Sequence, residues 1–331
     1  MWNNWFLIAL LNPVAWAFGC LLDVFLIDRK IYRSPIEPIV VSGLFCLLPL
    51  LVLTFQYWDS ANPPAQAIIG SGGLLSVVNL QQLQFSGATF SILAGLGLVF
   101  HLYFYFKALF IVNDASKLET INLLSVVLVP VLSFLLLREK LSLFQYAAIA
   151  LATCGVVVLI KGSRSPVQNA VLKYSGIAVL AMSLSMIFLV KAYELAAESE
   201  VMIWYFLTLF FSAYVCCLLN PKIRLRTSDL FVRFFYLFIL TEMIQLIAVF
   251  GSQRAIGLSG SASMVALVEC ALPLLIILFS VICLTAIRIR GKSTLNLTNI
   301  LTLQITNIRQ KSIALLLIGT SIGIIQWWNF N

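Results

Sequence analysis

Two polar helix faces are predicted near the middle of long apolar stretches, where a side chain cannot reach water. Glu242 is followed at i+3 by Gln245, and His101 is followed at i+4 by Tyr105, so each pair lies on one face of a helix. A carboxyl at that depth needs a hydrogen-bond partner, a cation or a bound proton. We therefore predict that these four residues bind substrate or carry a coupling proton or cation. The alternatives are a structural hydrogen bond for Glu242 and a satisfied core position for His101.

Eight further ionisable residues lie toward the ends of the predicted helices, in two groups that an inverted repeat would relate. Asp23, Lys107, Lys117 and Glu119 lie toward one membrane face, and Lys191, Glu194, Arg254 and Glu269 lie toward the other. Because each group mixes acids with bases, we predict two ion-pair gates that close alternately. The alternative is that these side chains extend to the lipid headgroups and gate nothing.

The composition places these residues in a membrane protein. Of the 331 residues, 61% are hydrophobic and 10% are charged, and the mean hydropathy is +1.02. A soluble domain is about 45–50% apolar and about 25% charged, so no soluble fold of this size could bury so much apolar surface. The net charge of +8 is therefore interpreted as a topology signal, with the lipid bilayer as partner and no nucleic acid. The seven cysteines all lie in apolar stretches and are predicted to pack rather than to form disulfides.

The fold class predicted is all-α, a polytopic membrane protein with about ten transmembrane helices, since a span needs about 20 apolar residues. The predicted spans are 5–27, 36–57, 89–111, 115–137, 142–161, 173–194, 200–219, 230–252, 260–284 and 312–328. The segment 58–88 contains Asn62-Pro63-Pro64 and a glycine-rich run, so we expect a loop that could include an interfacial helix.

The basic residues predict the orientation. With ten spans, fifteen of the 21 Lys and Arg residues lie on one side, and only Arg138, Lys140 and Arg254 lie on the other. The positive-inside rule then places both termini outside the cytoplasm. We expect a multi-pass protein of the cell membrane, specifically the bacterial inner membrane.

Ten spans divide into two five-helix halves, residues 1–165 and 166–331. An odd number of spans in each half implies that the halves are inverted relative to each other, as in many secondary transporters. Pro130 and Pro273 lie in the fourth and ninth spans, and Lys107 and Arg254 end the third and eighth. Gly319-x-x-x-Gly323 fits helix packing and could support a homodimer.

The first half also carries a recognisable order of motifs over residues 93–162. A glycine-containing span is followed by Lys107-Ala108-Leu109, a span with Pro130, Arg138-Glu139-Lys140-Leu141-Ser142 and a span ending with Gly155-Val156-Val157-Val158. This order resembles the EamA domain of the drug/metabolite transporter superfamily. The second half resembles it faintly and has no Glu-Arg-Leu-Ser equivalent after its proline. The resemblance implies transport by two inverted repeats; members commonly keep both termini in the cytoplasm, opposite to the charge distribution here.

We therefore predict a secondary transporter for a small polar metabolite, zwitterionic or amino-acid-like, that could be proton-coupled. An enzyme is not expected, because the chain has one histidine and lacks phosphate-loop and hydrolase motifs, and no cofactor or metal site is predicted. Two alternatives stay open. One is a flippase for a lipid-linked or phospholipid-type substrate, and the other is an accessory membrane subunit without transport of its own.

Overall fold

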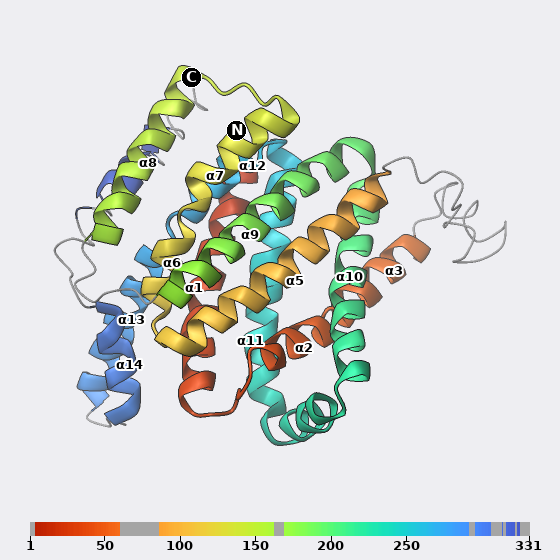
Figure 1. Ribbon diagram of the computed structural model, residues 1–331, viewed down its shortest axis with the longest axis vertical. Helices are drawn as coiled ribbons and strands as arrows, with labels where there is room; N and C mark the ends of the chain where they lie inside the picture. The colour runs from red at the N-terminus through yellow and green to blue at the C-terminus, as the bar shows by residue number, and fades with distance from the viewer. Residues whose placement is uncertain are drawn as a thin grey trace.

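The computed structural model of the protein describes residues 4–59, 86–161, 169–290 and 295–305, together with 313, 316–321 and 323–324. In these ranges every regular element is a helix, as predicted (Figure 1). The elements before residue 165 are α1 (Asn4–Asp28), α2 (Ile36–Phe45), α3 (Leu47–Asp59), α5 (Gly87–Val112), α6 (Ala115–Asn122), α7 (Ser125–Leu132), the π-helical turn η2 (Ser133–Leu137) and α8 (Leu143–Lys161). Those after it are α9 (Asn169–Leu195), α10 (Glu198–Leu219), α11 (Pro221–Ser259), α12 (Ala262–Glu269), α13 (Leu272–Arg290) and α14 (Leu295–Ile305).

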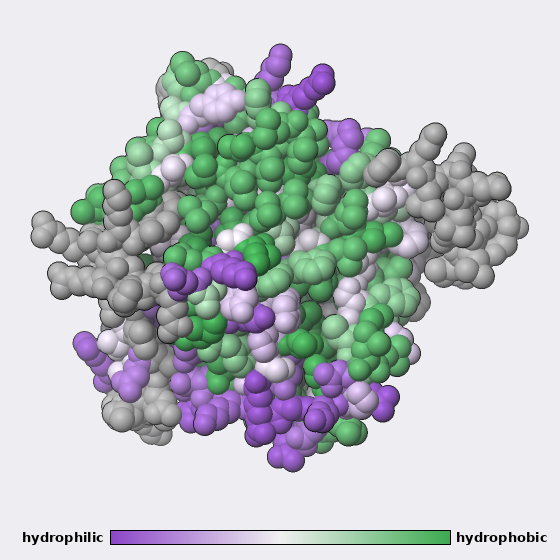
Figure 2. All heavy atoms as spheres, viewed as in Figure 1, coloured by the Kyte–Doolittle hydropathy of each residue, from purple (hydrophilic) through white to green (hydrophobic). Residues whose placement is uncertain are grey.

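Eight of the described helical segments are long and apolar enough to cross a membrane. They are Trp5–Asp28, Ile36–Thr54, Gly87–Val112, Ala115–Leu137, Asn169–Leu195, Glu198–Leu219, Pro221–Ser259 and Ala262–Ile289. Large side chains on their outer faces are exposed, such as Phe100 at 57% and Leu135 at 65%. Figure 2 shows hydrophobic residues over most of one face of the molecule. Lipid is the solvent that such a surface requires, so the chain is an all-α, multi-pass membrane protein.

The eight segments correspond to the predicted spans one to four and six to nine. The predicted fifth span is helix α8, whose apolar part, Leu143–Gly155, is shorter than the other eight. Most of the tenth, 312–328, lies outside the described residues, as does most of the predicted loop 58–88. At the ends of that loop, α3 ends at Asp59 and the Ser86 side chain caps α5 by accepting a hydrogen bond from the Thr89 amide.

Two long helix pairs form the centre of the bundle. α5 packs along α9, and α1 packs along α11; Figure 1 shows α5 and α9 crossing the front of the molecule together. Gly97 lets the first pair approach closely, because a Cβ atom there would lie 2.9 Å from the Ser185 Cβ and 3.1 Å from the Ala181 carbonyl oxygen. The absence of a side chain thus sets the distance between the two helices.

One local structure occurs twice, in the fourth and the ninth predicted span. The residue that caps the C-terminus of α5 is Asn113 and that of α11 is Gly260, both with left-handed backbone (φ 51° and 64°). The next residue, Asp114 or Ser261, caps a short helix, α6 or α12, by accepting from the amide three residues later. Each short helix has 8 residues and is followed by a two-residue interruption before the span resumes.

The interruptions are tightened helical turns rather than loops. At the first, the amide of Leu124 donates to the carbonyl of Ile121, three residues earlier. At the second, the amide of Ala271 donates in the same way to Val268. Pro273, in the first turn of α13, cannot donate an N–H and favours a helix start there. The spans predicted at 115–137 and 260–284 are therefore broken helices. At each break one side chain is buried, Leu123 or Cys270, whereas Leu124 faces outward.

Helix α11 begins earlier than the predicted span 230–252. Asn220 caps it by accepting from the Ile223 amide, Pro221 occupies its first turn, and the helix bends at Phe234, where the backbone is non-helical (φ −124°, ψ 23°). Residues 221–229, expected between spans, are thus helical. Ile223, Thr227 and Leu230 face the protein, while Lys222 and Arg224 are exposed. A helix with one buried face is stabilised by tertiary packing that loop propensities do not report.

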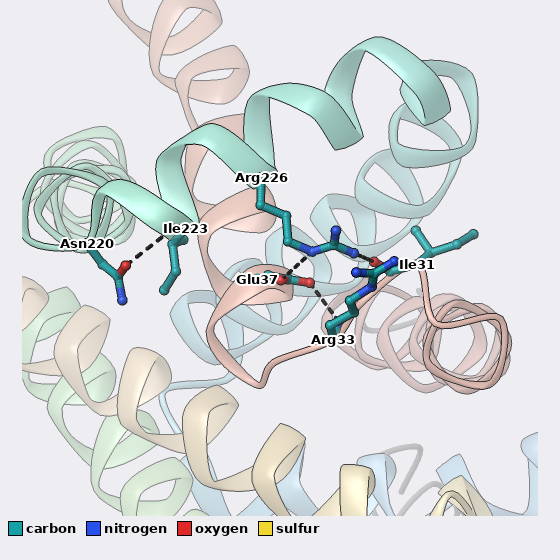
Figure 3. A network of polar contacts seen from close by, with 6 residues as sticks. All are labelled: Ile31, Arg33, Glu37, Asn220, Ile223 and Arg226. Atoms are coloured by element: carbon teal, nitrogen blue, oxygen red, sulfur yellow. Dashed lines mark hydrogen bonds and ion pairs between the residues drawn. The ribbon is translucent and has the colours of Figure 1, made fainter.

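A partly buried ion pair fixes this part of α11 to the connection between α1 and α2 (Figure 3). Arg226 donates from Nε to Glu37 Oε1 at 2.9 Å and from Nη2 to the Ile31 carbonyl at 2.9 Å. Glu37 Oε2 also accepts from the Arg33 amide at 2.7 Å. Hydrophilic residues gather at this end of the molecule in Figure 2. We name it the basic end, after Arg29, Lys30, Arg33, Lys222 and Arg224.

Candidate functional site

A cavity lies in the middle of the bundle, with an empty volume of about 890 Å³. Its walls come from α1, α5, α6, α7, α9, α10, α11, α12 and α13, so both halves of the chain contribute. Glu119 and Glu269 line it, and the described lining residues include no Lys or Arg. We name it the first cavity. The two carboxyl groups give it an acidic lining.

Glu269 is the last residue of α12, directly before the interruption of that span. Its Oε1 accepts a hydrogen bond from the Ser252 hydroxyl of α11 at 2.7 Å. The same oxygen contacts the Asn12 amide nitrogen of α1. Because both partners are neutral, they orient the carboxylate without neutralising its charge. It is therefore available to a cationic group in the cavity.

Glu119 lies on α6 and is 3% exposed. Its Oε2 accepts from Asn122 Nδ2 at 3.2 Å, and its Oε1 accepts from the Cys20 thiol at 3.5 Å. The Tyr105 hydroxyl lies 3.4 Å from the same sulfur. Three helices, α1, α5 and α6, thus supply neutral groups around a second buried carboxyl. Tyr105, predicted to act beside His101, helps to build this environment.

A second cavity, with an empty volume of about 480 Å³, adjoins the first and shares the lining residues Trp16, Leu98 and Val249 with it. Its polar lining includes Glu242, which is 1% exposed, and Gln245. The predicted polar face of this span therefore lines a cavity. Its charged lining residue, among those described, is again an acid.

Gln245 connects this cavity to Asp23 of α1, which is 4% exposed. Its Nε2 donates to Asp23 Oδ2 at 3.1 Å, and its Oε1 accepts from the Ser42 hydroxyl at 3.4 Å. Gly19 makes room for this bridge, because a Cβ atom there would lie 3.2 Å from Gln245 Cγ. The α1–α11 pairing thus depends on a glycine facing a glutamine.

His101 lines the first cavity and is 6% exposed. Its Nδ1 lies 3.0 Å from the Ala178 carbonyl oxygen of α9. A carbonyl can only accept, so Nδ1 carries the hydrogen, and in a neutral ring Nε2 is left as an acceptor. The ring also stacks on Tyr105, with ring centroids 5.8 Å apart. His101 thus joins α5 to α9 and contributes a polar edge to the cavity.

The structure distributes the residues predicted as gates among different partners. Glu119 and Glu269 line the first cavity, and Asp23 lies beside the second. Lys107 lies over the rings of Tyr103 and Tyr174, at 5.6 and 4.5 Å from their centroids. Lys191 pairs with Glu194 of its own helix at 2.7 Å, with both side chains 40% or more exposed. Arg254 pairs with Glu198, and the Lys117 amide donates to the cap Asp114. Gating by these residues stays a prediction.

Several site residues were not among the sequence candidates: Asn12, Trp16, Cys20, Asn122, Ser252 and Gln253. A signal for three of them exists in the sequence. Ser252 and Gln253 continue the helix face that begins with Glu242 and Gln245, at i+10 and i+11, across an otherwise apolar segment. Asn12 precedes Pro13 inside an apolar span, which is also an unusual place for an amide. Trp16 and Cys20 have no such signal, since both residue types are common in membrane helices.

Comparisons with known proteins bear on the fold alone. No family model matches the chain, and no curated protein matches it in sequence. A solved structure, described as a crystal structure of a protein, aligns with a TM-score of 0.54 at 16% sequence identity. The alignment covers 98% of this chain and 97% of that one. The arrangement of helices is therefore one that another protein of similar length adopts.

Proposed function

We propose that the protein is a secondary transporter for a small, water-soluble metabolite that carries an amino group. The observation that carries the proposal is the first cavity, which Glu119 and Glu269 line while hydrogen-bonded to neutral side chains. Leaving carboxylates in such a site is costly unless a cation or a proton compensates them. A cationic substrate supplies that compensation, and protons could replace it on the return step.

The acidic lining narrows the range of substrate classes that we expect. A zwitterion would need a basic group for its carboxylate, and the described lining residues of both cavities include no Lys or Arg. An amine, or an amino compound whose carboxylate is masked or distant, therefore fits better than a free amino acid. Trp16, which borders both cavities, offers an aromatic face to a cation.

Alternating access would use the two halves of the chain, 1–165 and 166–331, as inverted repeats. The twofold occurrence of the capped short helix, with α6 in one half and α12 in the other, supports this division. So do the pairings of α5 with α9 and of α1 with α11, because exchange of the halves converts one pair into the other. The resemblance of residues 93–162 to EamA transporters points the same way. Broken helices beside the cavity are typical of transporters, where they bind the cargo.

The test is metabolite profiling of cells and medium, with wild type, Glu269→Gln and an empty vector at matched protein levels. Glu200→Gln, an identical change on a partly exposed side chain of α10 that lies outside both cavities and the predicted gates, is the control. We expect an amine-bearing soluble metabolite to redistribute with wild type and the control but not with Glu269→Gln. Changes confined to lipid-linked species would instead indicate a flippase. Equal profiles for wild type and vector would contradict transport and favour an accessory subunit.

A further inference from the structure

The two cavities form an elongated site with an acid toward each end and apolar walls between. The residues that they share, Trp16, Leu98 and Val249, are hydrophobic. Glu269 lies on one side of these shared residues, and Glu242 lies on the other. A compact cation could not contact Glu269 and Glu242 at the same time. A ligand that satisfies both needs two positive charges joined by an apolar chain.

Helix α11 gives the scale of this site. Ser252, which binds Glu269, lies ten residues after Glu242 on the same helix. At 1.5 Å per residue, Glu242 and Ser252 are about 15 Å apart along the helix axis. With one charge-assisted hydrogen bond of about 2.8 Å at each end, the two cationic nitrogens would lie about 10 Å apart.

Two buried polar groups beside these acids have hydrogen-bonding capacity that the described residues do not fill. Gln253 lines the first cavity and is 1% exposed, and its amide makes no well-formed hydrogen bond among the described residues, with the Tyr205 hydroxyl of α10 as a polar neighbour. Asp23, next to the second cavity, has Oδ1 without one. Buried polar atoms are normally paired, because leaving one unpaired is costly. Both acceptors suit the N–H groups of an ammonium ion.

We propose that the site binds a linear aliphatic polyamine, with one terminal ammonium at Glu269 and Gln253 and the other at Glu242. The methylene chain would cross the shared apolar wall, and an internal ammonium, where present, would lie near the Trp16 ring. The proposal names the substrate class of the transporter proposed above. It rests on that function only for the movement of the polyamine across the membrane. Binding itself can be tested without transport.

The experiment is isothermal titration calorimetry on the purified full-length protein. The probes are 1,8-diaminooctane, the shorter 1,4-diaminobutane, and 8-amino-1-octanol, which keeps the length but replaces one ammonium with a hydroxyl. We expect the long diamine to bind at least about tenfold more tightly than either of the other two, which corresponds to 1.4 kcal/mol. In Glu242→Gln this advantage should disappear, whereas Glu200→Gln should keep it.

Equal affinities of the three probes for wild type would overturn the proposal, and that comparison needs no variant. So would a Glu242→Gln protein that still prefers the long diamine. In both cases a protein that binds these amines would still agree with amine transport. If no amine binds wild type and none redistributes in cells, the proposed function fails together with the polyamine site.

Discussion

Glu269 is the residue on which the amine site depends most directly. Glutamine has the same shape and can still accept hydrogen bonds from Ser252 and Asn12, so Glu269→Gln should fold normally. It removes the negative charge that would meet the ammonium group. A hydrogen bond to a charged group contributes about 1.5–3 kcal/mol, so we expect amine affinity to fall by at least about tenfold. Equilibrium binding of a labelled amine measures this, and unchanged affinity would exclude Glu269 as a ligand.

Gln253 should show opposite effects on stability and on binding. Gln253→Leu replaces a buried amide that makes no well-formed hydrogen bond among the described residues with an apolar side chain of similar size. Removing that desolvated polar group should raise the apparent melting temperature of the unliganded protein, while amine affinity falls. Thermal unfolding with and without ligand measures both quantities. A variant that is less stable and binds equally well would show that Gln253 has a structural partner and no role in the site.

At the scale of helices, the close packing of α5 on α9 should be intolerant of a single methyl group. Gly97→Ala would place Cβ 2.9 Å from the Ser185 Cβ, so the helices must separate or shift. We expect a lower melting temperature in detergent. Gly176→Ala, on α9 itself, meets nothing within 4 Å and is the matched control. Alanine favours helix by about 1 kcal/mol over glycine, so the control should be neutral or stabilising; equal losses in both variants would contradict the packing argument.

The contact between the α1–α2 connection and α11 should contribute measurably to the stability of the protein. Glu37→Ala leaves the Arg226 guanidinium partly buried without its carboxylate, at a cost of about 2–3 kcal/mol. The apparent melting temperature should then fall by about 5 °C or more. On the same helix, Asp229 and Arg233 form an exposed ion pair with 2.8 Å between Oδ1 and Nε. Asp229→Asn breaks this pair and should change the melting temperature little. If both variants melt like wild type, the ion pair does not hold the start of α11 in place.

The whole molecule has one further testable property, its orientation in the membrane. The basic end should face the cytoplasm, and the turn that contains Lys140 should face outward. A cysteine introduced at Lys140 or at Lys222 can be probed with a membrane-impermeant maleimide in intact cells. The parent protein serves as the blank for labelling of the chain's own cysteines. We expect Lys140→Cys to react in intact cells and Lys222→Cys only after permeabilisation. The reverse pattern would place both termini in the cytoplasm, as is common among EamA transporters.

The amino-acid sequence predicted the large-scale features because they depend on composition and on the spacing of apolar and polar residues. The apolar stretches place the spans, and Glu242 with Gln245 identifies a polar face that does line a cavity. It could not predict that Lys107 lies over aromatic rings or that Arg254 pairs with Glu198, since partners in space depend on helix packing. Nor could it predict the early start of α11, where one face of the helix is buried against the α1–α2 connection. Gln253 was within reach, because it extends the helix face of Glu242.

Transport of amines by the purified protein is the measurement that tests the central claim most directly. Proteoliposomes containing wild type or Glu269→Gln would be incubated with an equimolar mixture of amines, amino acids, sugars, nucleotides and carboxylic acids. Mass spectrometry of the washed vesicles then shows what has entered. The account predicts that amine-bearing compounds enter with wild type and do not enter above the level of protein-free vesicles with Glu269→Gln. Uptake that is equal in wild type and Glu269→Gln, or confined to compounds without an amino group, would contradict it.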